Sequence, residues 1–180
     1  KKSAADSSHI LIDLPVGPEA KFKSKEDAKR LAEKFVILGN KLNMKIEVII
    51  TDGSQPVGNG VGPALEARDV LLVLQNKGPE DLKKKAVYMA GMIFEMVGFK
   101  ESKKMALDIL ESGKAYKKFQ EIAKAQGGNP NIQPENIKVG KYLHTYRAHS
   151  QGKVSYLSND LISKIAKNAG APTDKGAGMY

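Results

Sequence analysis

The chain has 180 residues, of which 41% are hydrophobic and 27% charged, so it suits a globular domain or a piece of a larger protein rather than a disordered chain. It has no cysteine and no run of about 18 apolar residues, which excludes a disulfide framework and a transmembrane helix and fits the cytoplasm. The net charge of +9 suggests nucleic acid, but the lysines are scattered among acidic residues along helical segments, as on solvated faces.

The first third of the chain predicts a strand, a helix and a second strand. Residues 8–14 form a short apolar run that ends at a proline, and residues 45–51 form another such run. Between them, residues 25–42 carry apolar side chains at helical spacing, and Ser24 with Asp27 resembles a capping box. This order predicts a parallel sheet flanked by helices, an α/β fold.

A glycine-rich loop follows the second predicted strand. Residues 52–63 read DGSQPVGNGVGP, with four glycines and two prolines, and Pro63 opens the next predicted helix. Ligands of open parallel sheets bind beyond the carboxyl ends of the strands, so this loop is a candidate site, either for an anion at the helix N-terminus or for a cation on its carbonyls. A purely structural turn is the alternative. Lys21, just beyond the first strand, is a candidate phosphate ligand or an exposed surface lysine.

The rest of the chain is expected to be helical and then to change character. Helices are predicted over residues 79–98, 102–112 and 115–125. Two alternating segments, KYLHTYRAHS and KVSYL, then predict a β-hairpin over 141–157, before a capped helix that ends at Gly170. The segment DKGAGMY at 174–180 is expected to have no partner element in the chain. The predicted domains are the end of a helical domain (1–7), a central α/β domain (8–128) and the truncated start of a smaller C-terminal α+β subdomain (129–180).

The remaining chemistry-bearing residues do not assemble into a familiar site. The three histidines do not cluster, no zinc-ligand spacing is present, and no Ser-His-Asp arrangement can be assembled. The residues alone therefore predict an α/β fold with a ligand-binding edge and leave the ligand open.

A resemblance to a known family covers essentially the whole chain. TDGSQPVGNGVGPALEARDVL resembles the strand, loop and helix of thymidine and pyrimidine-nucleoside phosphorylases, and KKSAADSSHILIDLPVG and ESGKAYKKFQEIAKAQGG match in order. DLPVGPEAK and GAPTDKGAG are similar to the archaeal AMP phosphorylase branch. The chain is therefore expected to be a fragment of a larger pentosyltransferase.

The resemblance implies phosphorolysis of nucleoside 5′-monophosphates, in which AMP and inorganic phosphate give adenine and ribose 1,5-bisphosphate. It implies that Lys1 binds the base and Lys21 the nucleotide, plausibly at its 5′-phosphate. It also implies a monovalent or divalent cation held by Val57, Gly60 and Asp69, although the family has Glu where this chain has the shorter Asp69. Inorganic phosphate is the co-substrate and no organic cofactor is expected.

The resemblance places the phosphate-binding loop and the acid that protonates the base upstream of Lys1. No catalytic residue is therefore expected in this chain, which alone should be inactive, and the full-length enzyme should be a homodimer or higher homo-oligomer without nucleic-acid or membrane partners. Two alternatives stay open. One is a thymidine or pyrimidine-nucleoside phosphorylase, and the other, motivated by the net charge, is a non-catalytic basic RNA-binding module.

Overall fold

The computed structural model describes residues 2–180, which form two compact units. The first unit comprises residues 2–55 together with Lys84–Ile109. The second comprises Pro56–Lys83 together with Leu110–Tyr180. Lys1, the predicted base-binding residue, lies outside the described residues. The three-part domain division stays a prediction.

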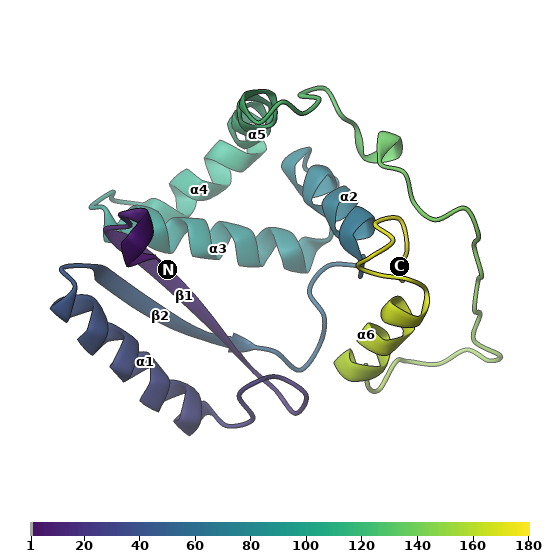
Figure 1. Cartoon of the computed structure of the whole chain (residues 1–180), viewed down its shortest axis with the longest axis horizontal. Helices are drawn as coiled ribbons and strands as arrows, with labels where there is room; N and C mark the ends of the chain where they lie inside the picture. The colour runs from purple at the N-terminus through teal and green to yellow at the C-terminus, as the bar shows by residue number, and fades with distance from the viewer. Residues whose placement is uncertain (1) are drawn as a thin grey trace. The chain divides into compact units, whose positions relative to one another are not determined.

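A two-stranded parallel sheet organises the first unit, as predicted (Figure 1). Strand β1 (His9–Val16) follows the short 3₁₀ helix η1 (Ser3–Ala5), and β1 pairs in register with β2 (Lys45–Asp52). Strand β1 runs two residues past its predicted end because Pro15, which lacks an N–H, is tolerated in a strand at the edge of a sheet.

Helices flank this sheet. Helix α1 (Lys25–Lys41) connects the two strands and packs against them, and the part of α3 (Glu80–Met96) from residue 84 onward runs along the other side (Figure 1). The Nζ of Lys45 donates a hydrogen bond to the carbonyl oxygen of Met96 at 2.7 Å, which ties β2 to the end of α3. Both helices match their predicted ranges within two residues, because long runs of helical periodicity are strong signals.

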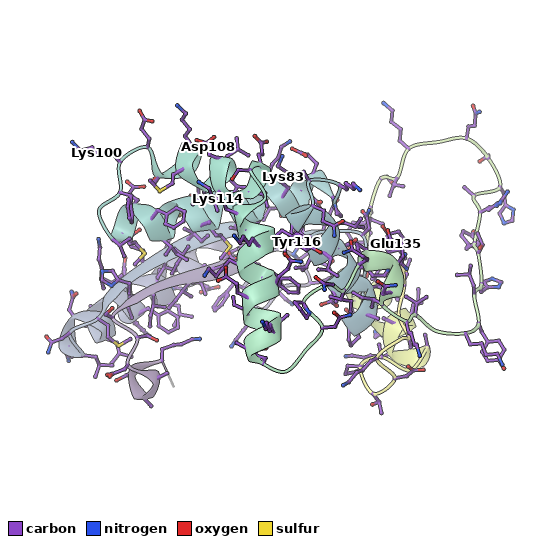
Figure 2. All side chains as sticks on the ribbon, turned by 90° about the horizontal axis from the view of Figure 1, so that it is seen from above. Lys83, Lys100, Asp108, Lys114, Tyr116 and Glu135 are labelled. Atoms are coloured by element: carbon purple, nitrogen blue, oxygen red, sulfur yellow. The ribbon has the colours of Figure 1, made fainter. Side chains whose placement is uncertain are left out.

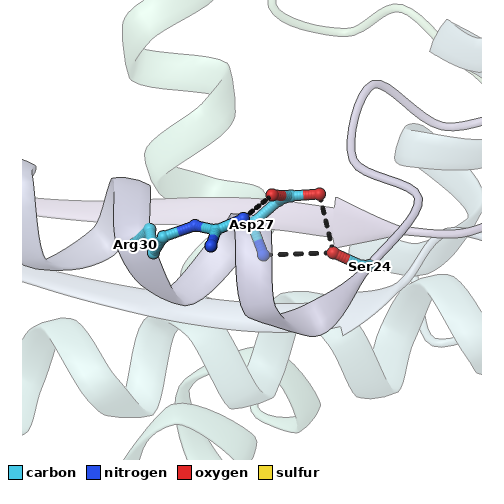
Figure 3. Close-up of polar contacts among 3 residues, drawn as sticks. All are labelled: Ser24, Asp27 and Arg30. Carbon is cyan, nitrogen blue, oxygen red and sulfur yellow. Dashed lines mark hydrogen bonds and ion pairs between the residues drawn. The ribbon is translucent and has the colours of Figure 1, made fainter.

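The N-terminus of α1 is capped as the sequence indicates (Figure 3). The Ser24 hydroxyl accepts a hydrogen bond from the Asp27 N–H at 3.1 Å and donates one to the Asp27 carboxylate at 2.7 Å. The Asp27 carboxylate also pairs with Arg30. The hydrogen bond from Ser24, and then that from Arg30, hold the pKa of Asp27 below its usual value.

We expect Ser24→Ala to lower the free energy of unfolding by about 1 kcal/mol, the usual loss for an N-cap. Because the folded-state pKa of Asp27 is lowered, its contribution is present above the unfolded-state pKa and is lost as the pH falls through the folded-state pKa. The effect should therefore be larger at about pH 7 than at about pH 2.5. Urea unfolding at both values tests this, with exposed Ser155→Ala as the control; equal losses at both values would contradict it.

The second unit is built from helices. It holds α2 (Pro63–Leu74), the end of α4 (Ser102–Glu111), α5 (Lys114–Ala125), the 3₁₀ helix η2 (Pro134–Asn136) and α6 (Asn159–Asn168). Tyr116 on α5 stacks on Phe119 and accepts a hydrogen bond from Gln133 at 3.2 Å (Figure 2). The buried apolar side chains of this unit come from several elements and are Ala64, Leu65, Leu71, Val73, Leu110, Pro134, Ala166 and Ala177. Across residues 2–180, no helix is both long and apolar enough to cross a membrane.

The predicted β-hairpin over residues 141–157 is wrong. The structure has no strand in this segment, and Tyr142 and Leu143 are 90% and 91% exposed. Figure 2 shows the ribbon beyond Glu135 on η2 continuing as an extended loop. Alternating β-forming residues need a neighbouring strand to bury one face, and a lone two-stranded hairpin is at best marginally stable. Repulsion among the lysine and arginine side chains of this segment also opposes a hairpin, since no acidic residue lies between Glu135 and Asp160 to offset their charge.

The expectation that residues 174–180 lack a partner is also wrong. Met179 forms an antiparallel bridge with Val61, immediately before α2, and Figure 1 shows the last segment of the chain beside the start of that helix. We call residues 174–179 the strap. The sequence did not reveal this pairing because a single bridge between two glycine-rich stretches shows no alternation of apolar and polar residues.

Candidate functional site

The loops that follow the two strands meet at the carboxyl edge of the sheet. The N–H of Gly53, just after β2, donates to the carbonyl oxygen of Val16 at the end of β1, at 2.8 Å. A Cβ on Gly17 would lie 2.5 Å from the backbone of Gly53, so no larger residue fits at this crossing without movement. The two glycines therefore allow the loops to touch directly.

Lys21 lies in the loop that follows β1. This loop turns back on itself, because the N–H of Gly17 donates to the carbonyl oxygen of Phe22 at 3.0 Å and Phe22 forms a bridge with Val16. Lys21 is exposed, and its ammonium has no hydrogen bond or ion pair with any residue in the described part of the chain. Its charge is therefore available to a ligand.

Asp69 on α2 is the most buried charged side chain of the second unit, 2% exposed. Its Oδ2 accepts hydrogen bonds from the N–H groups of Asn59 and Gly60, each at 2.7 Å. Its Oδ1 is buried and has no hydrogen-bond partner among residues 2–180. One carboxylate oxygen thus organises the glycine-rich loop, while the other is unpartnered within the part of the chain that the structure describes.

The N–H groups of Gly58, Val61 and Gly62 are also satisfied within the unit. Gly58 donates to Asp81 Oδ2 at 3.0 Å, and Gly62 donates to Glu66 Oε1 at 2.9 Å. Val61 donates to the carbonyl oxygen of Met179 at 2.8 Å. Every N–H from Gly58 to Gly62 therefore already has an acceptor, three of these acceptors being carboxylates.

This arrangement bears on the two ligand classes that the sequence left open for the loop. An anion site on backbone needs free N–H groups, and those of residues 58–62 are occupied. Three carboxylates beside the loop make it electronegative, and its carbonyl oxygens are the kind of ligand that a hard cation prefers. The geometry therefore favours a cation.

Two glycines of the loop have a definite steric role. Gly58 has a φ of +81°, and a Cβ there would lie 3.0 Å from Asp69 Oδ2. A Cβ on Gly60 would lie 2.5 Å from the carbonyl carbon of Leu65 in the first turn of α2. The loop can wrap around the Asp69 carboxylate only because these side chains are absent.

The structure brings together some of the predicted site residues. Gly60 and Asp69 are hydrogen-bonded, and Val57 belongs to the same loop, 38% exposed. Lys21 belongs to the other unit. Within residues 2–180, no group of three acidic, histidine or cysteine side chains is placed to hold a metal ion, so a cation at Asp69 would depend on backbone carbonyls.

A polar network on the sheet was missed by the sequence reasoning. The Nζ of Lys85 pairs with Asp13 Oδ2 at 2.6 Å, and the Thr51 hydroxyl donates to Asp13 Oδ1 at 2.6 Å. These partly buried groups join β1, β2 and α3 near the carboxyl edge. An aspartate inside the apolar run ILIDL was the available signal, because a buried carboxylate needs partners.

Fold and loop together define an α/β segment whose glycine-rich loop is held by three carboxylates. No protein-family model matches the chain. Individual relatives do: the chain is 47% identical to the AMP phosphorylase of Thermococcus sibiricus, 49% to that of Pyrococcus abyssi and 42% to that of Thermofilum pendens. These matches cover 99%, 99% and 100% of the chain, so its predicted resemblance to archaeal AMP phosphorylases is confirmed. The chain spans only 36%, 36% and 35% of the lengths of these relatives.

Proposed function

We propose that this chain is part of a longer enzyme that cleaves nucleoside 5′-monophosphates with inorganic phosphate, converting AMP and phosphate into adenine and ribose 1,5-bisphosphate. The observation that carries this proposal is the identity of 42% to 49%, along the whole chain, with proteins named AMP phosphorylase. As the base departs, positive charge develops on the sugar at C1′. Such an enzyme therefore accelerates the reaction mainly by positioning the phosphate and by stabilising this charge. The acid and the phosphate-binding loop are assigned to residues outside this chain.

Lys21 is proposed to bind the 5′-phosphate of the nucleotide. It lies beyond the carboxyl end of β1, where ligands of parallel sheets bind, and its ammonium is uncommitted within the described part of the chain. A compact, mobile cation suits a phosphate with its several equivalent oxygens. Lys1 keeps its proposed role on the base side.

The second part of the proposal is a cation held by the Asp69 carboxylate with the carbonyls of Val57 and Gly60. The unpartnered, buried Oδ1 of Asp69 fits it, because a buried polar atom without a partner costs free energy that an ion would offset. The shorter side chain is compatible, since Asp69 Oδ2 already reaches the loop. Such an ion would supply a fixed positive charge that holds the loop together.

A substrate panel tests the reaction. A full-length protein containing this segment, assayed with AMP, CMP, UMP, uridine and thymidine, should release base only when phosphate is present, and fastest from the monophosphates. Equal or better turnover of thymidine would contradict the proposal and favour a pyrimidine-nucleoside phosphorylase. The cytoplasmic location and the homo-oligomeric state stay predictions beside it.

A further inference from the structure

The strap holds the glycine-rich loop of the second unit from outside. Met179 exchanges two hydrogen bonds with Val61: Val61 N–H donates to the Met179 carbonyl at 2.8 Å, and Met179 N–H donates to the Val61 carbonyl at 2.9 Å. The carbonyl of Lys175 accepts the N–H of Ala64 in the first turn of α2, at 3.0 Å. The strap thus satisfies backbone groups on both sides of Pro63.

The contact between the strap and the loop is also sterically close. A Cβ on Gly178 would lie 2.2 Å from the Val61 carbonyl oxygen, and a Cβ on Gly62 would lie 2.4 Å from that of Ala177. Ala177 is buried. Two backbones therefore pack against each other where neither can carry an inward side chain.

The strap itself is held on its other side. The Asp174 carboxylate accepts the N–H of Gly176 at 2.9 Å, which shapes the turn at the start of the strap. The carbonyl of Gly176 then accepts the N–H of Gly140 at 2.7 Å. The strap is consequently a fixed support rather than a loose end laid on the loop.

The position of the strap bears directly on the candidate cation site. Val61 is the residue next to Gly60, whose N–H is bound by Asp69 and whose carbonyl is a proposed cation ligand. The Val61 N–H belongs to the same peptide plane as the Gly60 carbonyl, so its hydrogen bond to Met179 restricts rotation of that peptide and the direction of the Gly60 carbonyl. The bond to the Val61 carbonyl holds the next peptide, Val61–Gly62, in the same way. Asp69 restrains the loop from inside, and the strap restrains it from outside.

We propose that the strap is a positioning element for the candidate cation site, and that cation binding and docking of the strap strengthen each other. This rests on the cation site proposed above. Coupling of this kind is reciprocal: if the docked strap raises the affinity for the cation, the bound cation must hold the strap more firmly by the same factor. Gly178 and Met179 thereby act on the site without touching the ion.

Amide hydrogen exchange of the full chain tests the positioning claim without any cation. In Gly178→Ala, the amides of residues 58–62 should exchange at least about tenfold faster than in the unmodified chain, because the added methyl group separates strap and loop. Met179→Pro, which removes one of the two hydrogen bonds, should act in the same direction. Gly152→Ala is the matched control, since a Cβ there meets no atom within 4 Å. The amide of Leu71 in α2 reports global unfolding.

Unchanged exchange over residues 58–62 in both strap variants would overturn the proposal, as would acceleration of Leu71 to the same degree. The coupling between cation binding and strap docking is then measured by the unfolding midpoint. The midpoint in KCl or CaCl₂ is compared with that in choline chloride at equal ionic strength. We expect a cation-dependent rise in the unmodified chain and in Gly152→Ala, and a rise reduced by more than half in the strap variants. An equal rise in all variants would refute the coupling. No rise in the unmodified chain would remove the cation site, while the exchange result would still decide whether the strap positions the loop.

Discussion

Replacing Lys21 with alanine in a full-length enzyme that contains this segment is expected to lower kcat/KM for AMP by about 10- to 100-fold, mostly through a higher KM. A hydrogen bond to a charged group contributes about 1.5–3 kcal/mol, and each 1.4 kcal/mol corresponds to about a factor of ten. The contact is with a phosphate that does not react, so binding should suffer more than turnover. Steady-state kinetics with AMP measure the effect.

Two comparisons make this result specific. Lys23→Ala removes another exposed cation from the same loop and should change KM for AMP by less than about twofold, because salt screens surface charges that do not contact the ligand. The activity of Lys21→Ala on unphosphorylated nucleosides should equal that of the unmodified enzyme. An unchanged KM for AMP in Lys21→Ala would remove this residue from the substrate site.

Replacing Asp69 with alanine should lower the free energy of unfolding of the chain by about 3–5 kcal/mol. The change leaves the N–H groups of Asn59 and Gly60 without an acceptor, and each unsatisfied buried group costs about 1–3 kcal/mol. The vacated volume adds a packing loss. Urea unfolding followed by circular dichroism measures the difference.

Two further variants separate structure from ion binding at this position. Asp69→Asn keeps an oxygen for the two loop amides and should lose less stability than Asp69→Ala, yet it should abolish the cation-dependent rise in unfolding midpoint. Exposed Asp108→Ala is the matched control and should stay within about 0.5 kcal/mol of the unmodified chain. If Asp69→Ala is no more destabilising than Asp108→Ala, the carboxylate does not organise the loop.

The elements that the sequence predicted well are those with a strong internal signal. The periodicity of α1, the cap at Ser24 and the two apolar strands each depend on residues near one another in sequence, and the structure confirms all of them. The prediction of a hairpin over 141–157 was wrong because its signal is not internal to the segment. Alternating residues show only that a segment could form a strand, and whether it does depends on a neighbouring strand that the local sequence does not specify.

The candidate site was likewise only partly predictable from the sequence. The glycine-rich loop was visible as composition, but the sequence could not distinguish an anion from a cation, because that choice depends on which acceptors reach the loop N–H groups. Only Glu66 is near in sequence to the amide that it binds, and the other acceptors, Asp69, Asp81 and Met179, lie 9 or more positions away along the chain. Lys21 was visible only as a lysine after a strand. Its proposed role came from the resemblance to the phosphorylases, since the spacing of the residues does not specify it.

The saturated donors of the loop also bear on the design of inhibitors. A phosphonate, sulfonate or carboxylate placed against residues 58–62 would find no free N–H there and would be repelled by the carboxylates that bind these N–H groups. A compound that gains affinity there would have to present a cation or an N–H donor to the carbonyl side. Acidic fragments should instead be directed to the loop of the first unit that holds the exposed Lys21.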